Sequence, residues 1–476
     1  MKTAAVVLLF ARGAFGQTPD APGPSLLETL RAAAAASPEV LAATRRRDEA
    51  ALEEPLLLAN LDPKAIASYA AIDDRRPRAV PAFEGSRARI DRWEAGLTQT
   101  TLLGTEAKLA FQSERLVNAT AFRPLNPTVD SRLTFEFKQR LARYFWGRPD
   151  RARRARARSG VAAAQAALER TLSDALLRAA RAHVELAYAD ALVAIRERGV
   201  EDAKRLLEKY EERRRFGLAE NSDVLQAKAS LELQEIEAMV ARSLAERARV
   251  SLGAAVFSSS TPRGLRAGPV DFIPSRSALA VGEAEAMSRV PELMIARHRA
   301  ESLRWSARLA RLDTLPDLSL DASYSFAGLE TGYRRSWSDM STWRHPVSMV
   351  GMSVVFPLGF RHETLTRRQA DLQLAQAEAE VASIEASARR RWRDVGEQLS
   401  LSSARVAAAR RLFELEKRKY DSGLEDFKRG RASTDLLVRF QQDIRRAEAD
   451  LLRAQTDERT ALFEAADASG QLTRTP

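Results

Sequence analysis

Residues 309–324 read LARLDTLPDLSLDASY, and residues 57–69 carry a related stretch, LLANLDPKAIASY. Each stretch passes from Leu-Asp through a proline into residues that alternate between apolar and polar and end in Ser-Tyr. A proline stops a helix, and alternation with a period of two is typical of a strand. One helix-to-strand transition therefore occurs twice, which indicates an internal duplication.

Other matching pieces follow the same order in both halves of the chain. SPEVL at 37–41 matches VPELM at 290–294, and GLAENSDVL at 217–225 matches GRASTDLL at 430–437. A stretch rich in Gly, Ser and Pro separates the halves and has the composition of a linker. The sequence therefore predicts a first repeat at 17–252, a linker at 253–275, a second repeat at 276–468 and a C-terminal tail at 469–476.

The predicted helices are long and follow a coiled-coil repeat. Small or apolar residues recur at spacings of four and three along three segments: Leu172, Ala175, Ala179, Ala182, Leu186, Ala189 and Val193; Val224, Ala227, Leu231, Gln234, Ala238, Ala241, Ala245, Ala248 and Leu252; and Leu437, Phe440, Ile444, Ala447, Leu451 and Ala454. This heptad spacing is the mark of helices that pack along a seam. Segment 148–213 alone would span about 95 Å as a helix, and 361–421 predicts a similar rod. Rods of this length suit a tube or a stalk.

Four strand segments lie between the helices, in two hairpins at about 104–141 and 316–358. In the second strand, Leu133, Phe135 and Phe137 alternate with Glu136 and Lys138. Each segment has about 10–12 residues, the length of a tilted membrane strand. A single segment of this kind is more commonly an amphipathic strand on a soluble core. Two such hairpins, with polar loops at 116–130 and 329–346, favour a membrane sheet.

Four strands cannot close a membrane barrel, and open strand edges cannot lie in lipid. Three chains with four strands each would give twelve. The predicted fold class is therefore an α+β membrane protein with a trimeric twelve-stranded β-barrel, four strands per chain, continued by an α-helical coiled-coil barrel.

The N-terminus has the organisation of a signal peptide. Lys2 precedes the apolar run AAVVLLFA at 4–11, and a small-x-small site follows at 14–16, although Arg12 interrupts the pattern. Residues 1–16 are therefore predicted to direct export. The alternatives are an ordinary frayed N-terminus and a misassigned start codon.

The composition limits the classes of function. The chain has no Cys, and its four His show no metal spacing. No catalytic motif is present, so neither an enzyme nor a cofactor or metal site is predicted. The net charge of +11 leaves a basic coiled-coil scaffold or nucleic-acid-binding protein as the main alternative. A soluble periplasmic adaptor is a second alternative, because adaptors also contain long helical hairpins.

Three stretches carry a resemblance to a known family: LPDLSLDASY at 315–324, GMSVVFPLG at 351–359 and LLGTEAKL at 102–109. With the duplicated order, they make the chain resemble the TolC-like outer membrane efflux protein family. The resemblance implies a homotrimer in the outer membrane of a Gram-negative bacterium, with a tunnel that extends into the periplasm. It also implies a passive exit duct of a tripartite efflux or type I secretion system. The implied partners are a periplasmic adaptor, an inner-membrane transporter and outer-membrane lipid, with no nucleic acid.

The resemblance also implies an acidic ring at the periplasmic entrance. The matching position is Asp435, and its repeat partner is Asp223. Members of the family carry a second Asp one helical turn later, where this chain has Val438, so a weaker ring is expected. Tyr420 and Arg431 are further gate candidates on a longer turn. The alternative for both Asp residues is ordinary helix-start chemistry, because an acidic side chain caps and favours a helix N-terminus.

The strand pattern also predicts residues inside and at the rim of the barrel. Polar positions on the alternating strands are predicted to face the lumen, namely Lys108, Gln112, Glu136, Lys138 and Asp321. Phe145 and Trp146 follow the second strand and form an aromatic pair suited to a membrane interface.

Overall fold

The computed structural model describes residues 23–77, 79–80, 85, 87–118, 124–217, 219–256, 265–274, 281–356, 358–429, 431 and 434–473. The chain divides into two compact units. We call them the helical unit, which draws on 1–47, 163–296 and 380–476, and the sheet unit, which draws on 48–162 and 297–379. The predicted signal peptide at 1–16 lies outside the described residues.

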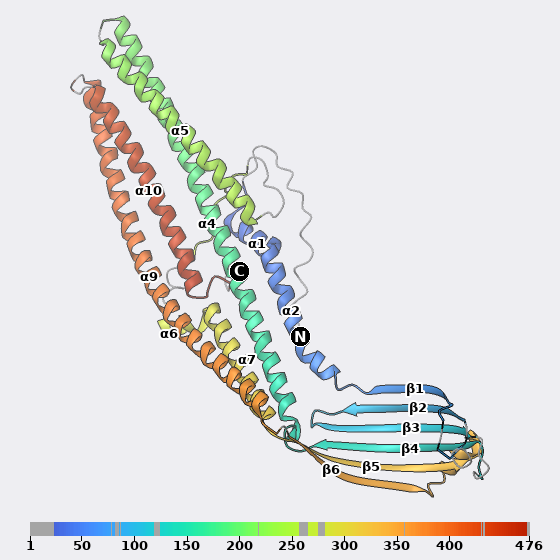
Figure 1. Ribbon diagram of the computed structural model, residues 1–476. Coiled ribbons are helices and arrows are strands. Elements are labelled where there is room, and N and C mark those ends of the chain that lie inside the picture. Colours follow the sequence, from blue (N-terminus) through green and yellow to red (C-terminus); the bar gives the residue numbers. More distant parts are fainter. Residues whose placement is uncertain are drawn as a thin grey trace. The chain divides into compact units, whose positions relative to one another are not determined.

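Helices make up most of the described chain (Figure 1). They are α1 (Leu26–Ala36), α2 (Pro38–Ala59), α4 (Arg148–Arg215), α5 (Asn221–Val256), α6 (Glu283–Arg289), α7 (Pro291–Asp313), α8 (Tyr333–Met340), α9 (Arg361–Lys428) and α10 (Thr434–Ala468), with a short 3-10 turn, η1 (Phe145–Gly147). The two predicted rods are confirmed, since α4 and α9 have 68 residues each. Within the described part of the chain, no helix combines the length and apolarity that crossing a membrane requires.

The predicted heptad seams are largely buried. On α5, eight of the nine predicted positions are buried. The exception is Leu231, which is half-exposed, while its neighbour Ser230 takes the buried place. On α10, Leu437, Ala447 and Ala454 are buried. The small side chains allow close helix packing, so the seams hold the helical hairpins together.

The core of the helical unit gathers α1, α4, α5 and α10 around Leu186, Leu252 and Phe463. His183 of α4 is fully buried beside this core. Its Nδ1 lies 3.0 Å from the Thr29 hydroxyl, and its Nε2 lies 3.3 Å from the Gly268 carbonyl oxygen. The Gly268 carbonyl oxygen can only accept, so Nε2 carries a proton and donates to it. The Thr29 hydroxyl has one proton, for which Nδ1 competes with the Ser25 carbonyl oxygen 2.8 Å away. His183 therefore ties α1 and the segment between the repeats to α4.

The sheet unit contains one antiparallel sheet of six strands in the order β1-β2-β3-β4-β5-β6 (Figure 1). The strands are β1 (Lys64–Asp74), β2 (Ala88–Thr100), β3 (Thr105–Asn118), β4 (Thr128–Arg140), β5 (Asp317–Glu330) and β6 (Pro346–Val355). The predicted combination of long helices with an antiparallel sheet is confirmed, and so are both predicted hairpins. The prediction of four strands per chain was wrong, because β1 and β2 join the same sheet.

The physical reason for the error lies in the pattern of the two missed strands. β1 carries Ile66 and Ile72 on one face and Tyr69 on the other, so it does not alternate cleanly. The duplication nevertheless contained the signal for β1, because Tyr69 matches Tyr324 of β5 in the repeated stretch. The hairpin β2–β3 has no equivalent in the second half, where β5 is followed directly by β6 in the sheet.

The contacts of His183 predict a pH-dependent stability. Burial lowers the pKa of its imidazole, below the unfolded value of about 6.5. The contribution of the neutral ring to the free energy of unfolding is therefore fully present above pH 6.5. It is lost as the pH falls from 6.5 to the pKa of the folded state. The loss is about 1.4 kcal/mol for each pH unit between the folded and unfolded pKa values. The denaturation midpoint should fall more between pH 8 and pH 5.5 for the wild type than for His183→Gln. Equal falls would contradict a neutral buried ring.

Candidate functional site

All five predicted lumen residues lie on one face of the sheet. Lys108 stands opposite Glu136 across β3 and β4, and Lys138 stands opposite Asp321 across β4 and β5. Gln112 lies four residues after Lys108 and so points to the same side. We call this side the charged face.

Ion pairs cross the charged face between neighbouring strands. Arg92 lies 2.7 Å from Glu114, and the Lys108 ammonium lies 3.4 Å from a carboxylate oxygen of Glu94. Lys138 and Asp321 approach to 3.5 Å. Each pair is partly exposed and contributes little stability. The face is therefore polar and hydrated, with both signs of charge interspersed, which suits contact with water rather than with lipid.

The opposite side, which we call the apolar face, presents large apolar side chains to the outside. Neighbours in register include Leu97, Leu109 and Phe135 across β2, β3 and β4. Phe135 and Phe137 are each 45% exposed. A continuous apolar face of this extent marks contact with lipid or with another protein.

An aromatic cluster lies on the apolar face toward the end where β1 and β5 finish. The ring centroids of Tyr69 and Trp93 are 4.5 Å apart. Trp337 of α8 packs edge-on against Phe111 at 5.6 Å, and Trp343 lies 3.8 Å from the Phe326 ring. Aromatic side chains of this kind concentrate at membrane interfaces. These residues were not predicted, because α8 forms within what the sequence presented as a polar loop.

The predicted interface pair Phe145 and Trp146 lies beyond the opposite end of β4, in η1. The two rings meet edge-on at 5.8 Å, and both side chains are exposed. Trp146 (φ 51°) and Gly147 (φ 68°) adopt left-handed backbone conformations in succession. A side chain on Gly147 would collide with the Leu102 carbonyl. This turn redirects the chain from β4 into α4 and places aromatic residues at the second end of the sheet.

Asp223 and Asp435 occupy the first turns of α5 and α10. Asp223 accepts a hydrogen bond of 3.1 Å from the Glu220 backbone N–H, which is helix-start chemistry. The exposed Asp435 carboxylate lies 2.9 Å from Arg439, one helical turn later. The two Asp residues therefore differ, since the first caps its helix and the second remains at the surface with a partly neutralised charge.

An apolar cluster joins the turn between α4 and α5 to the turn between α9 and α10. Val438, at the position of the expected second Asp, is 3% exposed and packs with Tyr210 and Val224. A carboxylate there would be buried without water. Tyr420 is half-buried, and burial followed by the nearby Asp202 charge raises the pKa of its hydroxyl. Arg431 is exposed, and its backbone N–H donates to the Asp426 carbonyl at 2.8 Å.

Comparison with known proteins gives one family match and one fold. Residues 284–468, less than half of the chain, match the family described as outer membrane efflux protein. This stretch is therefore similar to that family, in agreement with the resemblance found in the sequence.

Solved structures of outer membrane channels share the fold of this chain. The CmeC outer membrane channel of Campylobacter jejuni is 14% identical with a TM-score of 0.68, over 94% of this chain and 85% of that one. VceC of Vibrio cholerae is 17% identical with a TM-score of 0.64, over 94% and 96%. The open-state MtrE channel of Neisseria gonorrhoeae is 15% identical with a TM-score of 0.66, over 94% and 89%. No curated protein sequence matches the chain.

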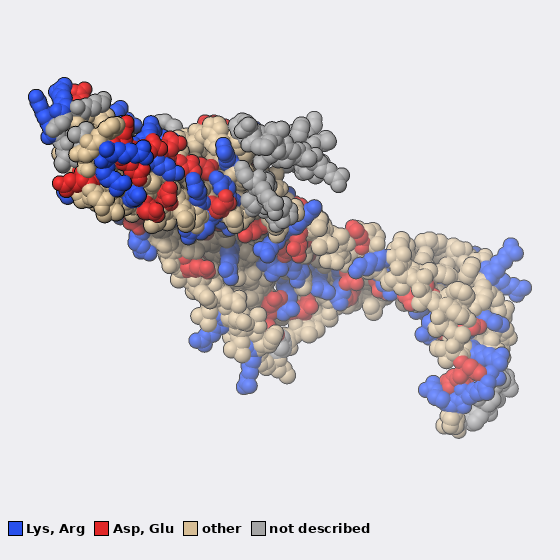
Figure 2. All heavy atoms as spheres, turned by 90° about the horizontal axis from the view of Figure 1, so that it is seen from above, with Lys and Arg blue, Asp and Glu red and all other residues tan. Residues whose placement is uncertain are grey.

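The two alternatives left by the sequence fit the structure less well than an outer membrane channel does. A basic nucleic-acid-binding scaffold would concentrate positive charge, but Lys and Arg are intermixed with Asp and Glu along the helices on the face shown in Figure 2. A periplasmic adaptor has no place for the six-stranded sheet with its apolar face.

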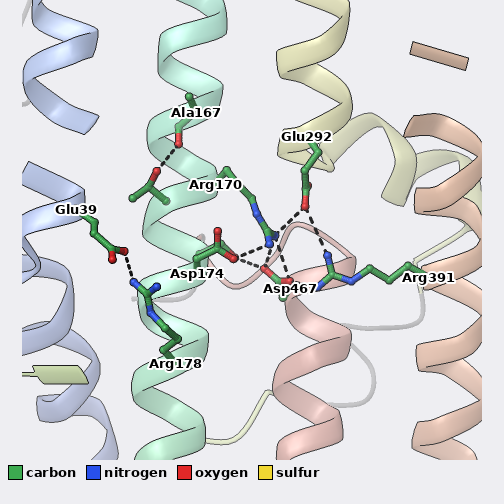
Figure 3. Close-up of polar contacts among 10 residues, drawn as sticks. Glu39, Ala167, Arg170, Asp174, Arg178, Glu292, Arg391 and Asp467 are labelled. Carbon is green, nitrogen blue, oxygen red and sulfur yellow. Dashed lines mark hydrogen bonds and ion pairs between the residues drawn. The ribbon is translucent and has the colours of Figure 1, made fainter. Parts of the chain in front are cut away.

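A buried polar cluster joins four helices of the helical unit (Figure 3). Asp467 of α10 has a side chain only 1% exposed and lies 2.5 Å from Arg391 of α9 and 3.4 Å from Arg170 of α4. Glu292 of α7 approaches both arginines, at 3.5 Å and 2.9 Å. Burial, opposed by Arg170 and reinforced by Asp467, raises the pKa of Asp174. The charges of the cluster compensate one another, so the loss of one member would leave its partners uncompensated.

We expect the removal of one member of this network to lower the free energy of unfolding strongly. Asp467→Asn would leave Arg170 and Arg391 without their shared carboxylate. The free energy of unfolding should fall by about 3 kcal/mol, the low end for breaking a buried pair, because both arginines reach solvent. The matched control is Asp443→Asn on the same helix, whose exposed pair with Lys419 spans 2.7 Å and should cost less than about 1 kcal/mol. Denaturant unfolding measures both, and equal losses would contradict the network.

Proposed function

We propose that three copies of this chain form a passive exit duct of a tripartite efflux or type I secretion system. The sheets close into a barrel in the outer membrane, and the helical hairpins form the periplasmic tunnel. A periplasmic adaptor and an inner-membrane transporter deliver the substrate and supply the energy. The observation that carries the proposal is the two-faced sheet, which has one apolar face for lipid and one charged face for water.

Open edges on this sheet support assembly of several copies. Lipid offers no hydrogen bonds, so a strand edge in the membrane must pair with another strand. One edge of β1 and one edge of β6 have no neighbour within the described sheet. The chain therefore needs other copies before it can span a membrane.

The long helices also present apolar stripes that the single chain leaves uncovered. On α5, the exposed side chains lie away from the buried seam and include Leu225, Ile236, Met239 and Val250. On α9, they include Leu365, Leu372, Leu401 and Leu415. A helix with a second apolar stripe can pack against two neighbours, as a closed ring of helices requires. These stripes support a helical tunnel built from several copies.

The gate is proposed to lie at the turns between α4 and α5 and between α9 and α10. Asp435 of each copy contributes to its acidic ring. The neighbouring contributors are Asp223, Tyr420 and Arg431. Exposure of the Asp435 carboxylate leaves it available to cations. The burial of Val438 supports a single ring, because no second acidic side chain follows one turn later.

The duct predicts both a location and a conductance. The full-length chain, expressed in a Gram-negative host, should enter the outer-membrane fraction of a density gradient, and the purified protein should conduct ions across a planar bilayer. A variant without residues 1–16 is the control and should remain in the cytoplasm. Retention of the full-length chain in the cytoplasm would contradict the proposed function.

The gate predicts a difference between the two Asp residues. Asp435→Asn should weaken the block of conductance by trivalent cations about tenfold, because it removes a charge contact of about 1–4 kcal/mol at the entrance. Asp223→Asn is the matched control and should change the block less, since that carboxylate caps α5. The measurement compares the blocking constants of the two variants, with the cation added from the periplasmic side. An equal effect of both variants would contradict the assignment of the acidic ring to Asp435.

A further inference from the structure

The two edge strands of the sheet have properties that the four inner strands lack. β1 and β6 are exposed along nearly their whole length. They have similar lengths of 11 and 10 residues. Since each strand runs antiparallel to the next through six strands, β1 and β6 run in opposite directions. An edge of β1 can therefore pair antiparallel with β6 of another copy.

The charged face becomes more apolar at these two margins. Inner strands carry charged pairs on this face, whereas β1 carries Ile66 and Ile72 there, at 40% and 42% exposed. β6 carries Val347 and Met349 on the same face, each 56% exposed. Apolar side chains facing water at both edges are unfavourable in a single chain. When β1 and β6 of neighbouring copies pair, these side chains become cross-strand neighbours and cover one another.

The hairpin β2–β3 is a full part of the sheet. β2 pairs with β1 without interruption from Lys64↔Thr98 to Asp74↔Ala88, and with β3 from Ala88↔Asn118 to Thr100↔Glu106. Ion pairs between Arg92 and Glu114 and between Lys108 and Glu94 reinforce it. All six strands therefore enter the closed structure together.

We propose that β1 of each copy pairs with β6 of the next, and that three copies of six strands close a barrel of eighteen strands. The proposal rests on the trimeric duct proposed above and adds its strand number and its seam. Barrel diameter grows roughly linearly with strand number, so the barrel is about 1.5 times as wide as a twelve-stranded one.

An eighteen-stranded barrel has a consequence for the substrate. Barrels of this size leave an open aqueous channel. The inner wall carries interspersed charges of both signs, paired across strands. The outer-membrane segment therefore accepts bulky hydrated cargo of either charge, and selection by size belongs to the helical tunnel and its gate.

Cysteine cross-linking tests the seam directly, because the chain has no Cys of its own. Ser68→Cys in β1 is combined in turn with Met349→Cys, Gly351→Cys or Ser353→Cys in β6, all on the charged face. After oxidation, at least one pair should give a ladder of covalent dimers and trimers that reductant abolishes. The matched control, Ser68→Cys with Ser323→Cys in the inner strand β5, should give no cross-link between copies.

Native mass measurement and imaging of the assembled protein in lipid complete the test. The expected result is three chains and eighteen strands. A complex of two chains, which would close twelve strands, overturns the proposal, and so does the absence of any β1–β6 cross-link. These outcomes differ from failure of the proposed function, because a protein that reaches the outer membrane and conducts ions without the cross-link loses only the eighteen-stranded seam.

Discussion

A strand in lipid must pair both of its backbone edges, because hydrocarbon supplies no hydrogen bonds. Inside one chain, β2 to β5 satisfy this constraint, and β1 and β6 satisfy it on one side only. The apolar face and the apolar margins of the charged face lie in the same sheet, and α5 and α9 add exposed apolar stripes of their own. In the proposed assembly, lipid covers the apolar face, and other copies of the chain cover the margins and the stripes.

The two ends of the sheet are marked by aromatic residues for a related reason. An apolar face that meets lipid must stop where headgroups and water begin, and aromatic rings tolerate that boundary. Trp343 packs on Phe326 toward one end, and Phe145 and Trp146 lie beyond the other. The left-handed conformation of Trp146 is uncommon for a bulky residue. It occurs in the seven-residue connection between the end of β4 at Arg140 and the start of α4 at Arg148.

Much of this organisation could be predicted from the sequence, because heptads and two-residue alternation are local patterns. The seams of α5 and α10 and the charged face with Lys108 and Asp321 were predictable in this way. β1 was not predicted, because an edge strand with apolar residues on both faces lacks a clean alternation. The burial of Val438 was also beyond the sequence, since it depends on two hairpins meeting at Tyr210, more than 200 residues away in the chain.

The alanine-rich seams leave one problem that the buried polar cluster solves. A seam of small, similar residues has nearly the same packing after a slide of one heptad, about 10 Å along the axis. Apolar contacts alone therefore define the register of such helices weakly. Asp467 is different, because a slide would remove its buried carboxylate from Arg391 and Ser173 and leave it unpaired. Buried polar groups are known to select one register in this way at some cost in stability. The cluster of Figure 3 thus sets the register of α10 against α4 and α9, and that register decides where the turn that carries Asp435 lies.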